Sequence, residues 1–273
     1  MTARGTAIRR LGPADHASCV ALCLDRSWSP EGRKWSLLLA ECDPFGIDAP
    51  DGDGLAGAVV LTRYGGGLAA IGMMLIAARY GGMGLGRALM EHALKAARQA
   101  TMVLTATRMG RPLYENLGFA PVRRSATFRG EFTTDPGPVP VARKATPDDL
   151  PAVLKADESA FGADRGFLLR RMPDTRLLPD GTGYAAASPG EEYTTIGPVV
   201  ARSVADARTL IASLAASITG PVRIDTDPDR PGLPGWLASR GLPMTGQTTF
   251  MVRGPWPVGS PDLLHALLNP ALG

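Results

Sequence analysis

Residues 71–119 read IGMMLIAARYGGMGLGRALMEHALKAARQATMVLTATRMGRPLYENLGF, and this stretch decides the fold. It opens with an apolar run, residues 71–78, which has the length of a strand and is too short for a typical helix. Glycine then dominates residues 81–86, and apolar residues at three- and four-residue steps predict an amphipathic helix after them. A strand, a glycine turn and a helix together predict an anion site, because the first N–H groups of a helix lack partners and the helix dipole favours negative charge there.

Two common phosphate-binding patterns fail on this glycine loop. The dinucleotide pattern G-x-G-x-x-G needs a third glycine where the sequence has Arg87, after Gly82 and Gly84. The phosphate-loop pattern G-x-x-x-x-G-K-S/T is absent as well. The loop therefore binds a different anion, or it is a structural turn.

The loop resembles the pyrophosphate loop of the GNAT N-acetyltransferases, whose pattern is Q/R-x-x-G-x-G followed by A or G. Gly84 and Gly86 take the two glycine places, and Gly81 takes the place of Gln or Arg. A register shifted by two residues would use Arg79, Gly82 and Gly84 instead. Glycine suits either register, because it lets the backbone approach the anion without a Cβ in the way.

A second segment, residues 111–119, resembles the segment that closes the same fold, A-x-x-L-Y-x-x-x-G-F, on a short helix before a strand. In the family this tyrosine typically protonates the departing coenzyme A thiolate, and Tyr114 is the residue that matches. The family's Asn and Ala ahead of it fall on Thr107 and Gly110. Two ordered signatures in a fitting context favour a GNAT fold over a structural turn and a core tyrosine in another α/β domain.

Length and composition allow two globular domains and exclude several classes of protein. The chain has 273 residues, and a net charge of +3 without a basic cluster interleaved with aromatics argues against a nucleic-acid partner. The three cysteines, Cys19, Cys23 and Cys42, form no CxxC pair, so we expect reduced core thiols rather than a disulfide or a metal site. No apolar run reaches membrane length, and we expect a cytoplasmic protein with no membrane partner.

Ahead of the glycine loop, the sequence predicts a hairpin. Residues 55–64 and 67–76 have the composition of strands, and glycines join them. Residues 44–54 are rich in Pro, Gly and Asp and are expected to form a loop.

The second half of the chain partly repeats the first. Residues 133–140 are rich in proline and predict an extended linker. After it, residues 144–149 (KATPDD) align with residues 10–15 (RLGPAD), and residues 236–242 align with residues 114–119. A second GNAT-like lobe explains this repeat better than coincidence does.

The second lobe lacks the residues of the first. Its apolar strand, residues 195–201, leads directly into a helix without a glycine loop, and the tyrosine position is Leu237, which has no proton to give. The expected fold class is therefore α/β (α+β): two tandem GNAT-like lobes, each a central mixed, mostly antiparallel sheet flanked by helices. The expected domains are residues 1–132, which bind acetyl-CoA, a linker at 133–140, and a degenerate GNAT-like domain at 141–273.

The resemblance also implies where the cosubstrate acetyl-CoA binds. Main-chain groups of the strand would hold the acetyl carbonyl and pantetheine, the N–H of Ile76 would stabilise the oxyanion, and the loop amides would hold the pyrophosphate. Tyr114 would then protonate the thiolate as a general acid, and no metal is expected. The implied coenzyme-binding residues are Met74, Leu75, Ile76, Gly81, Gly82, Met83, Gly84, Leu85, Gly86, Arg87 and Thr107.

The acceptor is expected to be a primary amine of a small molecule or peptide. The amine must lose a proton to attack the thioester, and the candidates for the base are Glu31, Glu41 or a water relay. In this fold the segment that contains Trp28, Glu31 and Trp35 often walls the acceptor site. The spacing of the two tryptophans fits a core-facing helix equally well.

Two classes of function follow from the sequence. The first is an N-acetyltransferase that works by direct attack in a ternary complex and acts as a monomer or homodimer. The alternative is a non-catalytic acyl-CoA-binding protein with a regulatory or scaffold role. Tyr114 together with the glycine loop favours the enzyme.

Overall fold

The computed structural model describes residues 7–134, 142–255 and 259–273. These residues form one 13-stranded sheet in the order β1-β2-β3-β4-β5-β12-β6-β11-β10-β9-β8-β7, with β13 paired to β10. The first half contains β1 (Ile8–Arg10), η1 (Pro13–Asp15), α1 (His16–Asp25), α2 (Gly32–Glu41), β2 (Asp43–Asp48), β3 (Leu55–Arg63), η2 (Gly65–Gly67), β4 (Leu68–Ile76), η3 (Ala78–Tyr80), α3 (Leu85–Ala97), β5 (Thr101–Ala106), α4 (Arg111–Asn116) and β6 (Ala120–Gly130). The second half contains β7 (Arg143–Lys144), η4 (Pro147–Asp149), α5 (Leu150–Phe161), α6 (Gly166–Leu169), β8 (Asp174–Leu177), β9 (Tyr184–Pro189), β10 (Thr194–Val200), α7 (Val204–Ala215), β11 (Val222–Thr226), α8 (Leu233–Ser239), β12 (Met244–Arg253), η5 (Pro261–Leu263) and β13 (Leu264–Ala266).

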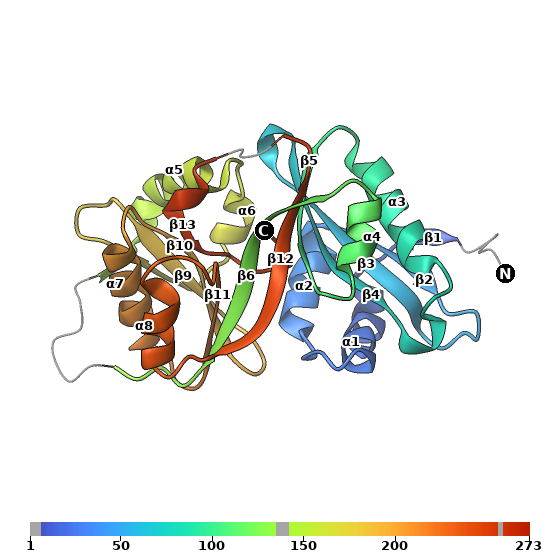
Figure 1. The fold of residues 1–273 in the computed structure, drawn as a ribbon, viewed down its shortest axis with the longest axis horizontal. Helices are drawn as coiled ribbons and strands as arrows, with labels where there is room; N and C mark the ends of the chain where they lie inside the picture. Colours follow the sequence, from blue (N-terminus) through green and yellow to red (C-terminus); the bar gives the residue numbers. More distant parts are fainter. Residues whose placement is uncertain (1–6, 135–141, 256–258) are drawn as a thin grey trace.

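Two strands, β6 and β12, join the lobes. β12 belongs to the second half of the chain, yet it pairs with β5 of the first half, for example through Thr249 and Ala106. β6 belongs to the first half and pairs with β11 of the second, for example through Thr127 and Asp225. The two strands also pair with each other, and they cross the middle of the molecule side by side in Figure 1. Each half therefore supplies a strand that extends the sheet of the other.

The internal repeat predicted from the sequence is confirmed at the start of both halves. Arg9 Nη2 lies 2.6 Å from Asp15 Oδ1, and Arg143 Nη2 lies 2.6 Å from Asp149 Oδ1. In each pair the aspartate follows the arginine by six positions and closes a one-turn helix, η1 or η4, that leads into the first long helix of its half.

The repeat also holds at the segment that contains Tyr114. The Phe119 N–H donates to the Tyr114 carbonyl at 3.0 Å, and the Leu242 N–H donates to the Leu237 carbonyl at 3.0 Å. The glycine inside each turn has a φ of 84°, a left-handed conformation that favours glycine. Leu237 therefore stands where Tyr114 stands in the first half, and its side chain is buried in the core of the second lobe.

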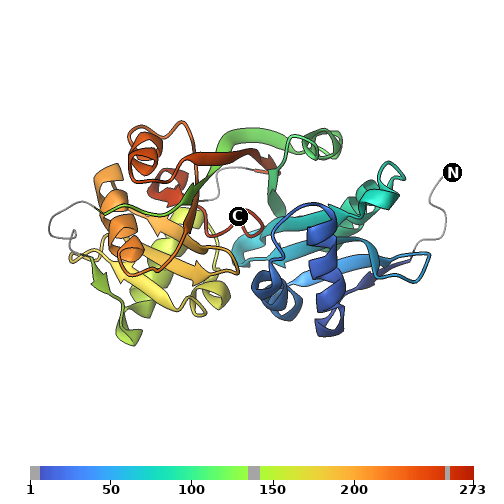
Figure 2. The same cartoon turned by 90° about the horizontal axis from the view of Figure 1, so that it is seen from below.

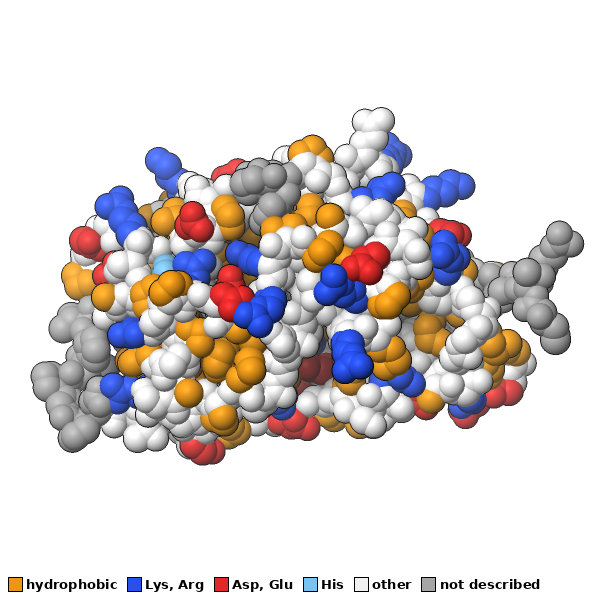
Figure 3. All heavy atoms as spheres, in the orientation of Figure 1, with side chains coloured by type: hydrophobic (Ala, Val, Ile, Leu, Met, Phe, Trp, Pro, Cys, Tyr) orange, Lys and Arg blue, Asp and Glu red, His pale blue; other side chains and the backbone are white. Residues whose placement is uncertain are grey.

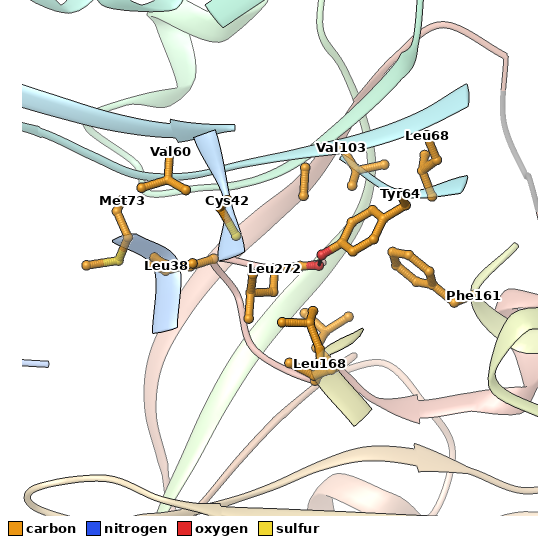
Figure 4. Close-up of a cluster of buried hydrophobic side chains, with 14 of the residues drawn as sticks. Leu38, Cys42, Val60, Tyr64, Leu68, Met73, Val103, Phe161, Leu168 and Leu272 are labelled. Atoms are coloured by element: carbon orange, nitrogen blue, oxygen red, sulfur yellow. Dashed lines mark hydrogen bonds between the residues drawn. The ribbon is translucent and has the colours of Figure 1, made fainter. Parts of the chain in front are cut away.

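One apolar core spans both lobes. It takes side chains from α1 and α2 in the first half and from α5 and α6 in the second, whereas α3 with α4 and α7 with α8 cover two further clusters. Figure 4 shows Tyr64 of the first half beside Phe161 of the second, and the Tyr64 hydroxyl donates to the Leu272 carbonyl at 2.5 Å. Figure 2 shows the C-terminal residues between the lobes, where they contribute to this shared core.

The prediction of a loop at residues 44–54 is wrong for its first part, which is strand β2. Phe45 and Ile47 pack into the cluster under α3, and β2 pairs with β1 on one side and β3 on the other. Pro44 is tolerated near the start of the strand, where its carbonyl still accepts the Leu11 N–H at 2.9 Å. Composition alone suggested a loop because the pairing partners of this strand are distant in sequence.

The predicted division of the chain at residues 133–140 stays a prediction. Residues 135–140 lie outside the described residues, and Thr133 and Thr134 precede them as coil. The exchange of β6 and β12 means that the cooperative unit of the sheet crosses this point.

The surface and the cysteines fit a globular protein. Cys19, Cys23 and Cys42 are buried and unpaired within the described residues, as expected from the sequence. Across residues 7–134, 142–255 and 259–273 no helix is long and apolar enough to cross a membrane. Figure 3 shows basic and acidic side chains interspersed over one face, without a large field of a single sign.

His265 in β13 makes the stability of the fold dependent on pH. Its side chain is 3% exposed, its Nε2 donates to the Ala201 carbonyl at 3.2 Å, and its Nδ1 accepts from Arg230 at 3.4 Å. Burial, together with the charge of Arg230, lowers the pKa of His265 to about 4 from its usual 6.5. The neutral imidazole fits this site, and a proton on Nδ1 would face the guanidinium.

Lowering the pH from 6.5 towards 4 is expected to destabilise the fold by up to about 3 kcal/mol through His265, because the unfolded chain takes up a proton that the folded chain excludes. Above pH 6.5 this destabilisation is absent. Urea unfolding at several pH values between 6.5 and 4 measures the change in the free energy of unfolding. His265→Gln should flatten the pH dependence of the stability. His92→Gln, which removes a ring that packs against Phe45, should leave this dependence in place. Equal slopes in the wild-type and His265→Gln chains would contradict this assignment.

Candidate active site

β4 and β5 pair over only part of their length, and we call the region beyond their last pair the V. The two strands pair in parallel from Leu68 with Thr101 to Ile71 with Leu104. Beyond these pairs β4 and β5 are not paired with each other. The register of β4 against β3 also shifts at Met73, whose φ of 48° places it in the left-handed region. A bulge with a non-glycine residue at positive φ is a strained feature, and such features concentrate at functional sites.

At the end of β4, the main-chain groups point alternately to β3 and to the V. The Ala77 N–H donates to the carbonyl of Ala56 in β3 at 3.0 Å. Polar groups of successive strand residues point to alternate edges, so the N–H of Ile76 points to the β5 side. The same alternation directs the main-chain groups of Met74 to that side.

The glycine loop lies at the end of the V, directly after η3. Gly82 and Gly84 have φ values of 76° and 80°, and a Cβ added to either would meet nothing within 4 Å. α3 begins at Leu85 with Gly84 as its N-cap, and no side chain caps it. Its first turn contains no acidic residue, and Arg87 in that turn is exposed. The helix therefore presents unpaired N–H groups and a positive dipole end to an anion.

The two registers considered for the loop differ in their basic residue. Arg79 donates to the Asp53 carbonyl at 2.8 Å and pairs with Asp51 at 3.2 Å, so it binds the loop between β2 and β3. Gly84 and Gly86 stand at the helix start. Which glycines take the family's places stays a prediction.

β4, α3 and α4 converge beside the loop. A Cβ on Gly86 would come within 3.3 Å of Met74 Cε and 3.5 Å of Leu113 Cδ2, so glycine allows the helix to approach the strand closely. Thr107 is exposed and its Oγ1 accepts the Gly110 N–H at 3.2 Å, which shapes the turn into α4.

Tyr114 is the buried phenol of this site. It is 8% exposed, and no protein group accepts or donates a hydrogen bond to its hydroxyl within the part of the chain that the structure describes. Burial raises its pKa to about 12. The hydroxyl therefore keeps its proton throughout the neutral range.

The end of α1 and the residue after it contact the segments that follow β4 and β5. Asp25 accepts the Ala78 N–H at 2.6 Å, and Arg26 Nη2 lies 4.0 Å from the sulfur of Met109 in the turn after β5. Trp28 in this segment is 41% exposed. Trp35 is fully buried and donates to Cys23 Sγ, so it is a core residue and not a wall of the acceptor site.

Glu31, the N-cap of α2, joins a polar cluster between the lobes. Its carboxylate lies 2.8 Å from Lys34 Nζ and accepts the Tyr193 hydroxyl at 3.1 Å. Tyr193 accepts from Arg223 at 2.9 Å, and Arg223 binds Asp225 through two hydrogen bonds of 2.7 and 2.9 Å. Burial lowers the pKa of Lys34, and the charge of Glu31 opposes this shift. We name this set of five residues the interlobe cluster.

The structure separates the two carboxylates considered as bases. Glu31 is part of the interlobe cluster, and its side chain is 13% exposed. Glu41 lies at the other end of α2 and pairs with Arg171. Sequence reasoning missed Tyr193 and Arg223, because Tyr193 lies 162 positions from Glu31 and no local pattern connects them.

Residues 225–229 (DTDPD) are rich in aspartate; they begin in the last residues of β11 and continue into a turn. Arg223 binds Asp225, Arg124 binds Asp229, and Asp227 accepts the Asp229 N–H at 2.9 Å. Within the described ranges no group of three or more His, Cys, Asp or Glu side chains is placed to hold a metal ion.

Comparison with protein-family models identifies the class of protein. Residues 17–119 match the model described as Acetyltransferase (GNAT) family, and residues 153–262 match the model described as Acetyltransferase (GNAT) domain. The chain therefore belongs to the GNAT N-acetyltransferases and contains two GNAT domains in tandem.

Whole-length relatives agree with this class. A protein of Bacillus subtilis (strain 168) named uncharacterized N-acetyltransferase YitH is 28% identical over 282 residues, covering 95% of this chain and 96% of the relative. A putative acetyltransferase from Pyrococcus horikoshii has a similar structure, with a TM-score of 0.80, 20% identity, and coverage of 100% of this chain and 98% of the other. A tandem GNAT protein from the clavulanic acid biosynthesis pathway has a TM-score of 0.64 and 14% identity, with coverage of 92% and 99%. At these identities the two structures support the fold alone.

Proposed function

We propose that the first GNAT domain transfers acetyl from acetyl-CoA to a primary amine of a small molecule or peptide by direct attack in a ternary complex. One juxtaposition supports the proposal: the V between β4 and β5 ends at the uncapped start of α3, with the unpartnered hydroxyl of Tyr114 on the adjacent helix α4. The family supplies the class of reaction, and these residues supply a site for it.

In this proposal, acetyl-CoA lies in the V with its pyrophosphate at the glycine loop. The N–H groups from Gly84 to Arg87 precede the first helical hydrogen bond, in which the Ala88 N–H donates to the Gly84 carbonyl at 3.1 Å. They are free to bind phosphate oxygens, and Gly82 and Gly84 leave room for the close approach. The main-chain groups of Met74 and Ile76 would hold pantetheine and the acetyl carbonyl.

We assign the steps of the reaction to particular atoms of the site. The neutral amine nitrogen attacks the thioester carbon, and the oxyanion accepts the Ile76 N–H. The C–S bond breaks, and the thiolate takes a hydrogen bond or a proton from the Tyr114 hydroxyl. The proton of the amine passes to a base, for which Glu31 or a water relay to it is our candidate.

The raised pKa of Tyr114 defines what the residue contributes. A phenol with a pKa of about 12 remains protonated at neutral pH, so its hydrogen is always available. Complete transfer to a thiolate, whose parent thiol has a pKa of about 8.5, is unfavourable on these values. Hydrogen-bond donation to the developing thiolate is therefore the larger part of the role in this proposal, and bulk water can complete the protonation.

We place the acceptor between the α1–α2 segment and the interlobe cluster. Asp25 and Arg26 tie this segment to the ends of β4 and β5, and Glu31 ties it to the second domain. A carboxylate held by Lys34 and Tyr193 can attract an ammonium group before that group loses its proton. The second domain would thus help to form the acceptor site of the first domain.

Coenzyme A thiol release with acetyl-CoA and a panel of amines, amino acids and peptide N-termini tests this function. We expect release that depends on an acceptor and disappears in Gly84→Asp, which adds a side chain and a negative charge at the start of α3. Gly181→Asp is the matched control, because Gly181 also has positive φ and open space around it but lies in the turn after β8. Tight acetyl-CoA binding without release for any amine would favour the non-catalytic alternative, and release that survives Gly84→Asp would contradict the proposed site.

A further inference from the structure

The second domain has a cleft equivalent to the V of the first. β10 repeats the Ile-Gly pair of β4, with Ile196-Gly197 in place of Ile71-Gly72, and its register against β9 shifts directly after that pair, between Ile196 and Val199. β10 pairs in parallel with β11 over only two registers, the last of which joins Thr195 to Arg223. Beyond this point the two strands are no longer paired with each other, as is the case for β4 and β5.

The chain's own strand β13 occupies this second V. It pairs antiparallel with β10 through Val199 with Ala266. On its other side the Leu267 N–H donates to the Asp225 carbonyl of β11 at 2.8 Å, and the Thr226 hydroxyl of β11 donates to the His265 carbonyl at 2.5 Å. β13 is thus hydrogen-bonded to both walls of the cleft.

The internal strand uses the same main-chain group that we assign to the acetyl site in the first domain. Counting from the Ile-Gly pair, Ala201 is the counterpart of Ile76, and its N–H donates to the Leu263 carbonyl at 3.0 Å. The fit is close at the bulge as well, since a Cβ on Gly197 would lie 2.0 Å from the Leu267 carbonyl oxygen.

The helix that follows β10 is closed to anions. Only residues 201–203 separate β10 from α7, whereas residues 77–84 separate β4 from α3. Ser203 caps α7 by accepting the Asp206 N–H at 3.1 Å, and the Asp206 carboxylate adds negative charge to the first turn. Both features disfavour a pyrophosphate at this position.

We propose that residues 263–267 are a permanent internal occupant of the second coenzyme cleft, so that the chain binds acyl-CoA in its first domain only. The statement about the first domain rests on the function proposed above, and the statement about the second does not. The second domain is then a scaffold whose former cofactor groove holds a peptide strand.

The occupying segment continues into the first domain, which gives the filled cleft a structural role. A Cβ on Gly72 of β4 would lie 2.2 Å from the Ala271 carbonyl oxygen, and Tyr64 donates to the Leu272 carbonyl. Gly72 directly precedes the bulge residue Met73. A single segment therefore fills one V and packs behind the bulge that opens the other.

Calorimetric titration of the full chain with acetyl-CoA tests the stoichiometry. We expect one equivalent for the wild type, one for the control Gly181→Asp and none for Gly84→Asp. Two equivalents in the wild type would overturn the proposal, as would binding by Gly84→Asp that is abolished by Gly197→Val in the second cleft.

Hydrogen–deuterium exchange tests the occupant independently of any activity. The amides of Ala201 and Leu267 should exchange slowly without ligand and remain unchanged with acetyl-CoA, whereas the Ile76 amide should be slowed by acetyl-CoA. Gly197→Ala should accelerate exchange at Ala201 and Leu267 by roughly tenfold or more through local opening, and Gly246→Ala, whose added methyl group meets nothing within 4 Å, should not.

The outcomes of this experiment separate the two proposals. If the wild type binds no acetyl-CoA, the proposed function fails, and slow exchange at Ala201 would still support the internal occupant. Fast exchange at Ala201 in the folded wild type, or protection at Ala201 that increases with acetyl-CoA, would overturn it.

Discussion

Separated at the linker, the fragments 1–134 and 142–273 are expected to be unfolded when each is made alone. The first fragment lacks β12, which lies between β5 and β6, and the second lacks β6, which lies between β12 and β11. Each would also expose its part of the shared core, in which Tyr64 packs against Phe161 and Leu272. The lost pairing and burial exceed the total stability of a typical domain, about 5–15 kcal/mol.

Circular dichroism and urea unfolding of the separate fragments measure this effect. Co-expression of both fragments is expected to restore one folded species, because the exchanged strands can pair across a chain break. A full chain cleaved once within residues 135–140 is the control and should remain associated and folded. Cooperative unfolding of the first fragment by itself would show that the lobes are independent domains.

Tyr114→Phe is expected to lower kcat by roughly 100- to 1,000-fold, within the range for loss of a positioned acid. The affinity for acetyl-CoA should stay within about twofold, because the hydroxyl acts on the departing sulfur and not on the pyrophosphate. The melting temperature should also remain close to that of the wild type, because no protein partner of this hydroxyl is found in the described residues. Steady-state kinetics, calorimetry and thermal unfolding together test the three expectations.

Tyr64→Phe is the matched control for this substitution. Tyr64 is also a buried tyrosine, but its hydroxyl donates to the Leu272 carbonyl. Its loss should cost about 1 kcal/mol of stability and leave kcat unchanged. Because the pKa of Tyr114 is about 12, any basic limb of the pH–rate profile below pH 10 should be the same in both proteins. Equal turnover of Tyr114→Phe and the wild type would remove Tyr114 from the mechanism.

The sequence by itself determined the local structure of the site. Glycine at positive φ, apolar periodicity and a short closing helix predicted the turn at Gly84, the start of α3 and the place of Tyr114. The repeat of proline and aspartate predicted a second lobe, and the counterpart of Tyr114 was correctly identified as Leu237. These features are readable because each depends on residues within a few turns of one another.

Only the tertiary structure decided which strands are neighbours. An alternating or apolar run indicates that a strand is buried, but it does not indicate which strand pairs with it. The sequence pattern therefore did not predict the exchange of β6 and β12, the insertion of β13 into the second cleft or the contact of Tyr193 with Glu31. The bulge at Met73 was likewise hidden, because it arises from a register mismatch with β3. Backbone pairing between distant segments has no residue-specific code, so the assembly of this site depends on the packing of the whole chain.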